Sequence, residues 1–410
     1  MKNGKSVAVL GYGALRMPTI DGGHANKQDS DGYSESTIDA TLLQRQVSYM
    51  LTHGINYFDT APNYCRGESE ARLGAAIAGS RVRRENIILA TKLSNFEPQQ
   101  HSLDACKAMF EQSLKNLRTD YIDNYVLDDV GVGGFETFQK RFLDNGALGW
   151  IADMRTSGLV KGLGFSYDGD QKAFEWCLEH HSEYKWDFCQ IRMNYVDWQH
   201  AKEVRNYSIN AKDLYERLTD LEIPVIVMDP LLGERLARKN YALSKMLGPL
   251  AADTTLAMWA FRFCGTFPNV LTILPGMTKM ENIVENVKTC SPLLPCNARA
   301  LEVLERAAQA LLALHTIPCT VCGNCVPCPF GIDIPSILTF RNKVITKERP
   351  PTTRQTLEMY EAVVPDRLRR AEYCTGCDKC LASCPEKINI SDELASIDKW
   401  VDSLIEEELD

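Results

Sequence analysis

The sequence has no apolar run approaching the roughly 18 residues that a membrane-spanning helix needs. It also shows no secretory leader, because the basic start Met1–Lys5 is followed only by a short apolar stretch that reaches Arg16 without a convincing cleavage site. Basic residues are not in excess: 45 Lys and Arg stand against 54 Asp and Glu, a net charge of −9. We therefore expect a cytoplasmic protein whose main partners are neither nucleic acid nor membranes.

A glycine-rich dinucleotide fingerprint is also missing. The segment Gly11–Arg16 lacks the third glycine and is not followed by a helical pattern, which weakens an open, doubly wound sheet. Instead, eight strand-like runs alternate with amphipathic helical runs up to about residue 297, which predicts a (β/α)8 TIM barrel. The runs are 11–17, 56–59, 87–91, 122–127, 162–166, 188–193, 224–228 and 270–274 for strands, and 37–53, 68–78, 102–117, 149–157, 171–179, 211–221, 253–265 and 280–288 for helices.

Polar side chains follow two of these predicted strands. Asp59 and Tyr64 come just after the second strand, and Lys92 follows the third. The carboxyl ends of barrel strands are where such folds keep their chemistry. A lysine beside Asp59 and pointed at Tyr64 would lower the pKa of the phenol, which could then act as a general acid towards a carbonyl oxygen. The alternative is three ordinary polar residues near strand ends.

Two long segments leave predicted strand ends, at residues 18–36 and 128–148. Both could shape a substrate pocket, and both could equally be surface loops. After the predicted barrel (1–297), an apolar stripe in 298–315 indicates a linker helix, within 298–318, that packs on the barrel. The tail, about 391–405, is expected to be a helix that opens at Ser391.

Eight of the 15 cysteines form two tight groups in the last part of the chain, 319–410. The second has the spacing of a bacterial ferredoxin, in which three cysteines hold one cluster and the fourth, before a proline, reaches the other. This logic predicts two [4Fe–4S] clusters in an α-rich, ferredoxin-like domain. One would be held by Cys319, Cys322, Cys325 and Cys384, and the other by Cys374, Cys377, Cys380 and Cys328.

The first group departs from the ferredoxin spacing by one residue before Cys328, so that ligand is the least firmly assigned. Zinc and disulfides are the alternatives. Paired Cys-x-x-Cys knuckles would suit zinc, but the eight cysteines of the two groups are more than one pair of knuckles needs. Disulfides are not expected without a secretory signal.

Several segments of the barrel part follow the pattern of a known family. They are Gly11–Gly13 with Arg16 and Pro18, Asp59–Ala61 with Tyr64, 67–70 with Leu73-Gly74, Lys92, and 120–123. By these segments the first 290 or so residues resemble the aldo/keto reductases. By its cysteine spacing the last part, 90 or so residues, resembles the ferredoxin-type extension of one branch of that family.

This resemblance implies a barrel that binds NADP(H) or NAD(H) across its mouth. Tyr64 would be the proton donor, and Asp59 and Lys92 would tune it. The remaining contacts would fall on Ser166 and Gln190 for the carboxamide, Met228 for the nicotinamide ring, and Gly276, Met277, Thr278, Asn282, Glu285 and Asn286 for the adenosine end.

Three positions depart from the family pattern. Asp128 stands where the family has a catalytic His, and an ionised Asp cannot donate a hydrogen bond to the substrate oxygen. Met228 replaces an aromatic ring. Gly276 and Asn282 replace basic contacts to the 2′-phosphate, so the preference between NADPH and NADH is open.

Three functions are compatible with this reading. The first is an oxidoreductase that reduces a small carbonyl or related substrate while the clusters relay electrons to the substrate or to a redox partner protein. The second is an iron–sulfur carrier or docking subunit on a degenerate barrel. The third is a reductase with structural clusters. Joining hydride to single-electron chemistry normally needs a flavin, for which we find no clear fingerprint.

Overall fold

The computed structural model describes residues 6–20, 38–251, 253–366 and 370–409. Eight parallel strands follow one another in sequence order around a sheet, and a parallel bridge between Leu10 and Ile273 joins its two edges. The predicted (β/α)8 barrel is confirmed, although the first strand is only two residues long. The strands are β1 (Tyr12–Gly13), β2 (Tyr57–Asp59), β3 (Ile88–Leu93), β4 (Ile122–Val130), β5 (Val160–Tyr167), β6 (Phe188–Arg192), β7 (Val225–Met228) and β8 (Val270–Leu274).

Each predicted helical run of the barrel contains a helix. Some of their starts are capped by a side chain: Asp39, Ser102 and Asp170 each accept a hydrogen bond from a first-turn N–H. These helices are α1 (Ala40–Thr52), α2 (Ser69–Gly79), α3 (Leu103–Leu117), α5 (Ala147–Ser157), α6 (Gln171–Glu179), α9 (Ala211–Asp220), α11 (Leu256–Cys264) and α12 (Met280–Thr289). The pattern did not predict α4 (Phe135–Phe138), α7 (His181–Tyr184), α8 (Asp197–Val204) or α10 (Tyr241–Leu247).

The segment 128–148 is not the open loop that we expected. Residues up to Val130 extend β4, and α4 together with a π-helical turn at Gln139–Leu143 occupies most of the rest. Aromatic side chains explain this, because Phe138 and Phe142 are fully buried against the barrel. The other proposed pocket loop, 18–36, lies largely outside the described residues.

Separate apolar cores hold the two parts of the chain. Inside the barrel, Tyr57, Val126, Phe188 and Ile226 form one small cluster, and a larger layer lies between strands and helices. The helix α13 (Ala298–Ala313) adds its apolar stripe to that layer. A further core belongs to the C-terminal helices α14 (Ile334–Ile345), α15 (Thr353–Val363), α16 (Lys379–Ser383) and α17 (Ile390–Leu409).

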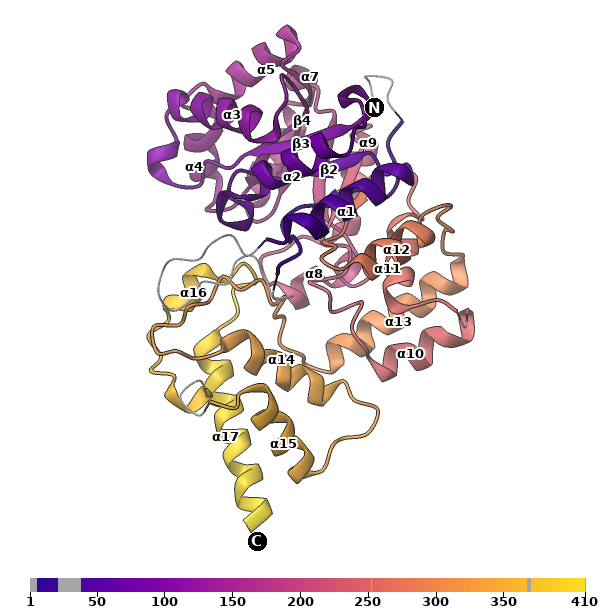
Figure 1. The fold of residues 1–410 in the computed structure, drawn as a ribbon, viewed down its shortest axis with the longest axis vertical. Coiled ribbons are helices and arrows are strands. Elements are labelled where there is room, and N and C mark those ends of the chain that lie inside the picture. The colour runs from indigo at the N-terminus through magenta and orange to yellow at the C-terminus, as the bar shows by residue number, and fades with distance from the viewer. Residues whose placement is uncertain (1–5, 21–37, 252, 367–369, 410) are drawn as a thin grey trace.

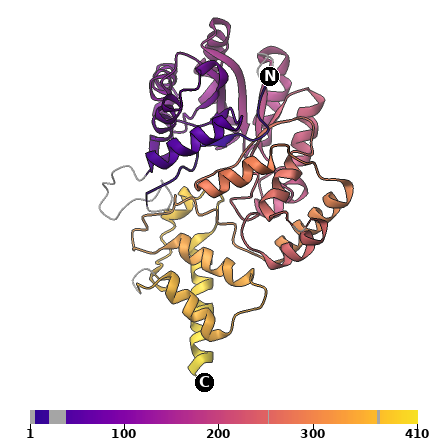
Figure 2. The ribbon, with the colours of Figure 1, turned by 45° about the vertical axis from the view of Figure 1, so that its right-hand side comes forward.

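The helix α17 begins at Ile390, slightly earlier than the expected cap at Ser391. Its residues Leu394, Ile397 and Val401 are buried in the C-terminal core. The C-terminal helices lie together beside the barrel, below it in Figures 1 and 2. Of the helices described, none has both the length and the apolar character to cross a bilayer.

Candidate active site

Asp59, Tyr64 and Lys92 meet at one end of the barrel. The parallel pairing of β2 with β3 brings their carboxyl ends together. Nζ of Lys92 donates a hydrogen bond to the Tyr64 hydroxyl at 2.7 Å and lies 3.6 Å from Oδ1 of Asp59. Asp59 and Lys92 are almost completely buried, whereas the ring of Tyr64 is partly exposed. A phenol in contact with a buried cation is an arrangement suited to proton transfer.

The turn that carries Tyr64 is strained. Cys65 and Arg66, directly after it, both have left-handed backbones, with φ of 49° and 57°. Such conformations cost non-glycine residues about 1–3 kcal/mol each and cluster at functional sites. The thiol of Cys65 points at the backbone oxygens of Ala14 and Leu15, 3.7 and 3.6 Å away, which ties the turn to the end of β1.

Asp128 gives the lysine a second carboxylate. Its Oδ1 lies 3.7 Å from Nζ of Lys92, and its Oδ2 accepts a hydrogen bond from Ser94 at 2.6 Å. Arg141, itself buried, donates to the backbone oxygens of Asp128 at 2.6 Å and Asp129 at 3.2 Å. The end of β4 is therefore held firmly, and Asp128 faces a cation.

Burial and charge act in opposite directions on these groups. Burial raises the pKa of Asp59, and the Lys92 charge opposes this rise. For Lys92, burial alone would lower the pKa, but Asp59, Tyr64 and Asp128 together raise it well above its ordinary value. Burial also raises the pKa of Tyr64 above its ordinary value, against the pull of Lys92. Lys92 therefore does lower the pKa of the phenol, as expected, but burial raises that pKa by more.

A cavity of about 770 Å³ opens over these residues, a size that suits a large ligand. Asp59, Tyr64 and Lys92 line it from the barrel side. The C-terminal part of the chain supplies the opposite wall, with Cys322, Asn324, Ser383 and Glu386. Of the predicted pocket segment 128–148, Asp129 lines this cavity, whereas residues 131–148 do not.

Of the predicted nucleotide contacts, Gln190, Met228 and Gly276 line this cavity. Nε2 of Gln190 donates to Asp59 at 2.6 Å, while its buried Oε1 has no partner among the described residues. A buried unpaired acceptor fits the amide N–H of a nicotinamide.

The other predicted contacts lie elsewhere. The Ser166 hydroxyl is already engaged, because it accepts from the Asp129 N–H at 2.7 Å and contacts the carboxylates of Asp128 and Asp129. The Met277 side chain is buried in the core. Thr278, Asn282, Glu285 and Asn286 lie on or just before α12 and do not line the cavity.

The thiols of the eight clustered cysteines interact with one another in two groups. Burial, and then the thiols of Cys319, Cys322 and Cys384, raise the pKa of Cys325 to about 12. Burial, and then the thiols of Cys328, Cys374 and Cys377, also raise the pKa of Cys380. In the described chain no three His, Cys, Asp or Glu side chains converge on a single ion. A cubane, by contrast, spreads its thiolates over separate corners, and both sets have the thiol donors that iron–sulfur clusters use.

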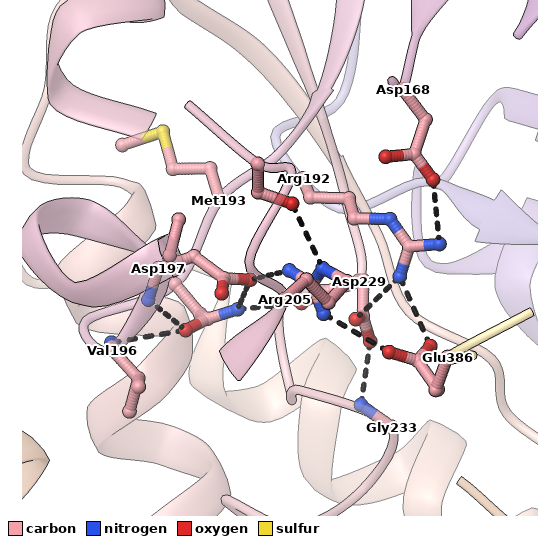
Figure 3. Close-up of polar contacts among 12 residues, drawn as sticks. Asp168, Arg192, Met193, Val196, Asp197, Arg205, Asp229, Gly233 and Glu386 are labelled. Atoms are coloured by element: carbon pink, nitrogen blue, oxygen red, sulfur yellow. Dashed lines mark hydrogen bonds and ion pairs between the residues drawn. The ribbon is translucent and has the colours of Figure 1, made fainter. Parts of the chain in front are cut away.

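An ionic network joins the first cysteine set to the barrel (Figure 3). Glu386, two residues after Cys384, is buried and accepts from Arg192 at 3.2 Å and from Arg205 at 3.1 Å. Arg192, at the end of β6, also contacts Asp168 at 3.1 Å and Asp229 at 3.4 Å. The two arginines lower the pKa of Glu386 although burial opposes them.

Comparison with known proteins identifies the barrel. The model of the aldo/keto reductase family matches residues 22–298, and that of the 4Fe-4S dicluster domain matches residues 318–389. The first match covers more than half of the chain. The chain belongs to the aldo/keto reductase family.

Individual relatives of this aldo/keto reductase agree. The uncharacterized oxidoreductase YcsN of Bacillus subtilis is 28% identical over 282 residues, which covers 62% of this chain and 84% of that protein. A probable voltage-gated potassium channel subunit beta of Arabidopsis thaliana is 26% identical over 303 residues, covering 63% and 84%. The holo form of an aldo-keto reductase from Bacillus halodurans has the same fold, with a TM-score of 0.55 at 21% identity over 73% of this chain and 92% of that one.

The aldo/keto reductase is therefore an NAD(P)H-dependent oxidoreductase with a C-terminal 4Fe–4S domain. Sequence reasoning missed several residues of its site: Arg141, Arg192, Arg205 and Glu386. The only signal for Glu386 was its place directly after the cluster proline. Nothing in the local pattern indicated that it reaches two arginines 181 and 194 residues away.

Proposed function

We propose that this aldo/keto reductase reduces a small carbonyl or related substrate with NAD(P)H, that Tyr64 is the proton donor, and that two [4Fe–4S] clusters exchange electrons with the site. One observation carries the proposal. The Tyr64 hydroxyl, 2.7 Å from Nζ of Lys92, and the cysteine loop at Cys322 line the same cavity.

The residues divide the work as follows. Tyr64 gives its proton to the substrate oxygen, and Lys92 stabilises the phenolate that remains. Asp59 holds Lys92 in place, and Gln190 offers its free carbonyl to the nicotinamide amide. When bound, the nicotinamide supplies a hydride, and the clusters supply single electrons. Asp128 acts as a partner of Lys92 rather than as a donor to the substrate.

The proton-donor role is tested with Tyr64→Phe. We expect turnover to fall by a factor of about 100 or more, the usual contribution of a positioned general acid, while NAD(P)H still binds. Tyr49→Phe on α1 is the matched control and should retain full activity. Retained turnover in Tyr64→Phe would overturn the assignment.

The electron link is tested anaerobically on the holoprotein without substrate. NADPH and NADH are added separately, and cluster absorbance near 400 nm is followed with EPR on the same samples. Bleaching with a reduced-cluster signal supports the relay. The control is a chemical donor whose reduction potential is similar to that of NAD(P)H. If this donor reduces the clusters but neither nucleotide bleaches them, the clusters are structural.

A second candidate is an electron carrier on a catalytically degenerate barrel. The observation that favours it is Asp128, whose carboxylate opposes negative charge on a substrate oxygen. Quenching of tryptophan fluorescence by NADPH separates the two functions. An absence of binding at millimolar nucleotide would favour the carrier.

A further inference from the structure

A second cavity lies between the barrel and the iron–sulfur domain, apart from the active-site cavity. Its volume is about 280 Å³. The segment that follows β7 supplies one wall, with Arg235, Arg238 and Lys239. The helix α14 supplies another, with Thr339 and Lys343. We propose that this basic pocket binds a small phosphate-bearing anion.

The charge of the pocket is the first argument. Four cationic side chains line it, and no Asp or Glu of the described chain does. Within the described residues, Arg238, Lys239 and Lys343 take part in no ion pair. Like charges brought together destabilise a fold unless a counter-charge meets them, and this chain carries a net charge of −9. A cationic pocket without acids on such a chain points to an anionic ligand.

Hydrogen-bonding capacity is the second argument. The Nε atom of Arg235 and the hydroxyl of Thr339 are buried and have no partner among the described residues. A buried donor that lacks a partner destabilises the fold. Burial also lowers the pKa of Arg235, against the pull of Asp197 and Glu386. Both residues line the pocket, and an anion bound there would offer oxygens to these two donors.

The mixture of donors indicates the ligand class. Three parts of the chain supply donors to the pocket: the segment after β7, Thr316 and α14. Together they bring two guanidinium groups, two ammonium groups and threonine hydroxyls. Guanidinium forks match the oxygens of phosphate in pairs, and a phosphate offers acceptors on every side. A carboxylate, which is planar and carries two oxygens, would leave most of these donors unused.

The test is titration calorimetry of the holoprotein at low ionic strength, with pyrophosphate and inorganic phosphate as probes. We expect one saturable site per chain. The variant Arg238→Gln/Lys343→Gln should weaken binding about tenfold or more, since two charge-assisted contacts are lost. The control Lys288→Gln/Arg299→Gln makes the same charge change elsewhere and should bind as the wild type does.

Each other outcome overturns the proposal. No saturable binding would show that the pocket holds no such anion. If both double variants bound pyrophosphate equally weakly, the anion would be attracted by the net charge of the protein and not by this pocket. Displacement of pyrophosphate by saturating NADPH, with binding unaffected in Arg238→Gln/Lys343→Gln, would place the anion in the active-site cavity. Cluster absorbance confirms that every variant is folded and loaded.

The calorimetric measurement does not depend on the proposed reductase activity.

Discussion

Lys92 contacts the phenol and two carboxylates of the site. It donates to Tyr64, and it has one carboxylate on either side, Asp59 at 3.6 Å and Asp128 at 3.7 Å. In the described chain its side chain is only 4% exposed, so these interactions are only weakly screened. A single cation therefore contacts the phenol and compensates two buried acids.

Replacing this cation tests its role. Lys92→Met should lower kcat about 100-fold or more, because the phenolate left by proton transfer loses its counter-charge. The free energy of unfolding should also fall by about 3–5 kcal/mol, since buried carboxylates are left unpaired. Lys107→Met on α3 is the control. An unchanged kcat would remove Lys92 from the mechanism.

The same groups predict a pH profile. The pKa of Tyr64 and the pKa of Lys92 are both raised, so the phenol stays protonated and the ammonium stays charged throughout the neutral range. The proton-donating form is lost only as the pH rises through these raised values. We expect kcat/KM to show no alkaline decline between about pH 7 and about pH 10. A decline centred below pH 9 would contradict the raised phenol pKa.

Replacing Asp128 should change kcat in the opposite direction. In Asp128→Asn the amide can donate a hydrogen bond to the substrate oxygen, where the carboxylate repels the charge that develops there. We expect kcat for carbonyl reduction to rise, by up to about tenfold. Asp144→Asn, at the end of the π-helical turn, is the control. A marked fall in kcat would show that the native chemistry uses the carboxylate.

At the scale of elements, the end of β6 and the segment after Cys384 hold the two parts of the chain together. Glu386 accepts from Arg192 and Arg205, and its side chain is 5% exposed. A glycine assists nearby. A Cβ on Gly233, whose φ is +60°, would lie 2.6 Å from Cβ of Thr320, so only glycine permits this approach of the barrel loop to the cysteine loop.

Removing this acid should loosen the docking. Glu386→Ala leaves two buried arginines with fewer partners, and we expect a loss of about 3–5 kcal/mol in the free energy of unfolding. The lowered pKa of Glu386 means that its contribution is full above the ordinary pKa of 4.5 and is lost as the pH falls through the lower folded value. Chemical denaturation, with Glu348→Ala as control, measures the loss. Equal stability of the two variants would show that the network is incidental.

At the scale of the whole molecule, the two cysteine sets cross between the sequence groups. Cys384 joins the set of Cys319, and Cys328 joins the set of Cys380. Each cluster would therefore tie together segments about 50 residues apart, which explains how a small core of α14, α15 and α17 can be stable.

Cys328→Ser tests this crossing. The set of Cys374, Cys377 and Cys380 would lose its fourth ligand, so we expect the iron content to fall from about eight to about four or five per chain. The cluster next to the cavity should keep its EPR signal. Loss of that signal, with the other cluster intact, would show that Cys328 belongs to the set of Cys319 instead.

The sequence by itself determined the barrel and the meeting of Asp59, Tyr64 and Lys92, and it predicts the cysteine sets. Periodicity encodes which faces are buried, parallel strands must end together, and short cysteine spacing leaves few ways to meet. The shared cavity, the arginines that hold Glu386 and the basic pocket were decided only by the tertiary structure. They join residues far apart in the chain, and no local pattern records how a second domain sits on a barrel. The balance of burial against charge at Tyr64 was decided there too, because desolvation exists only once the chain is folded.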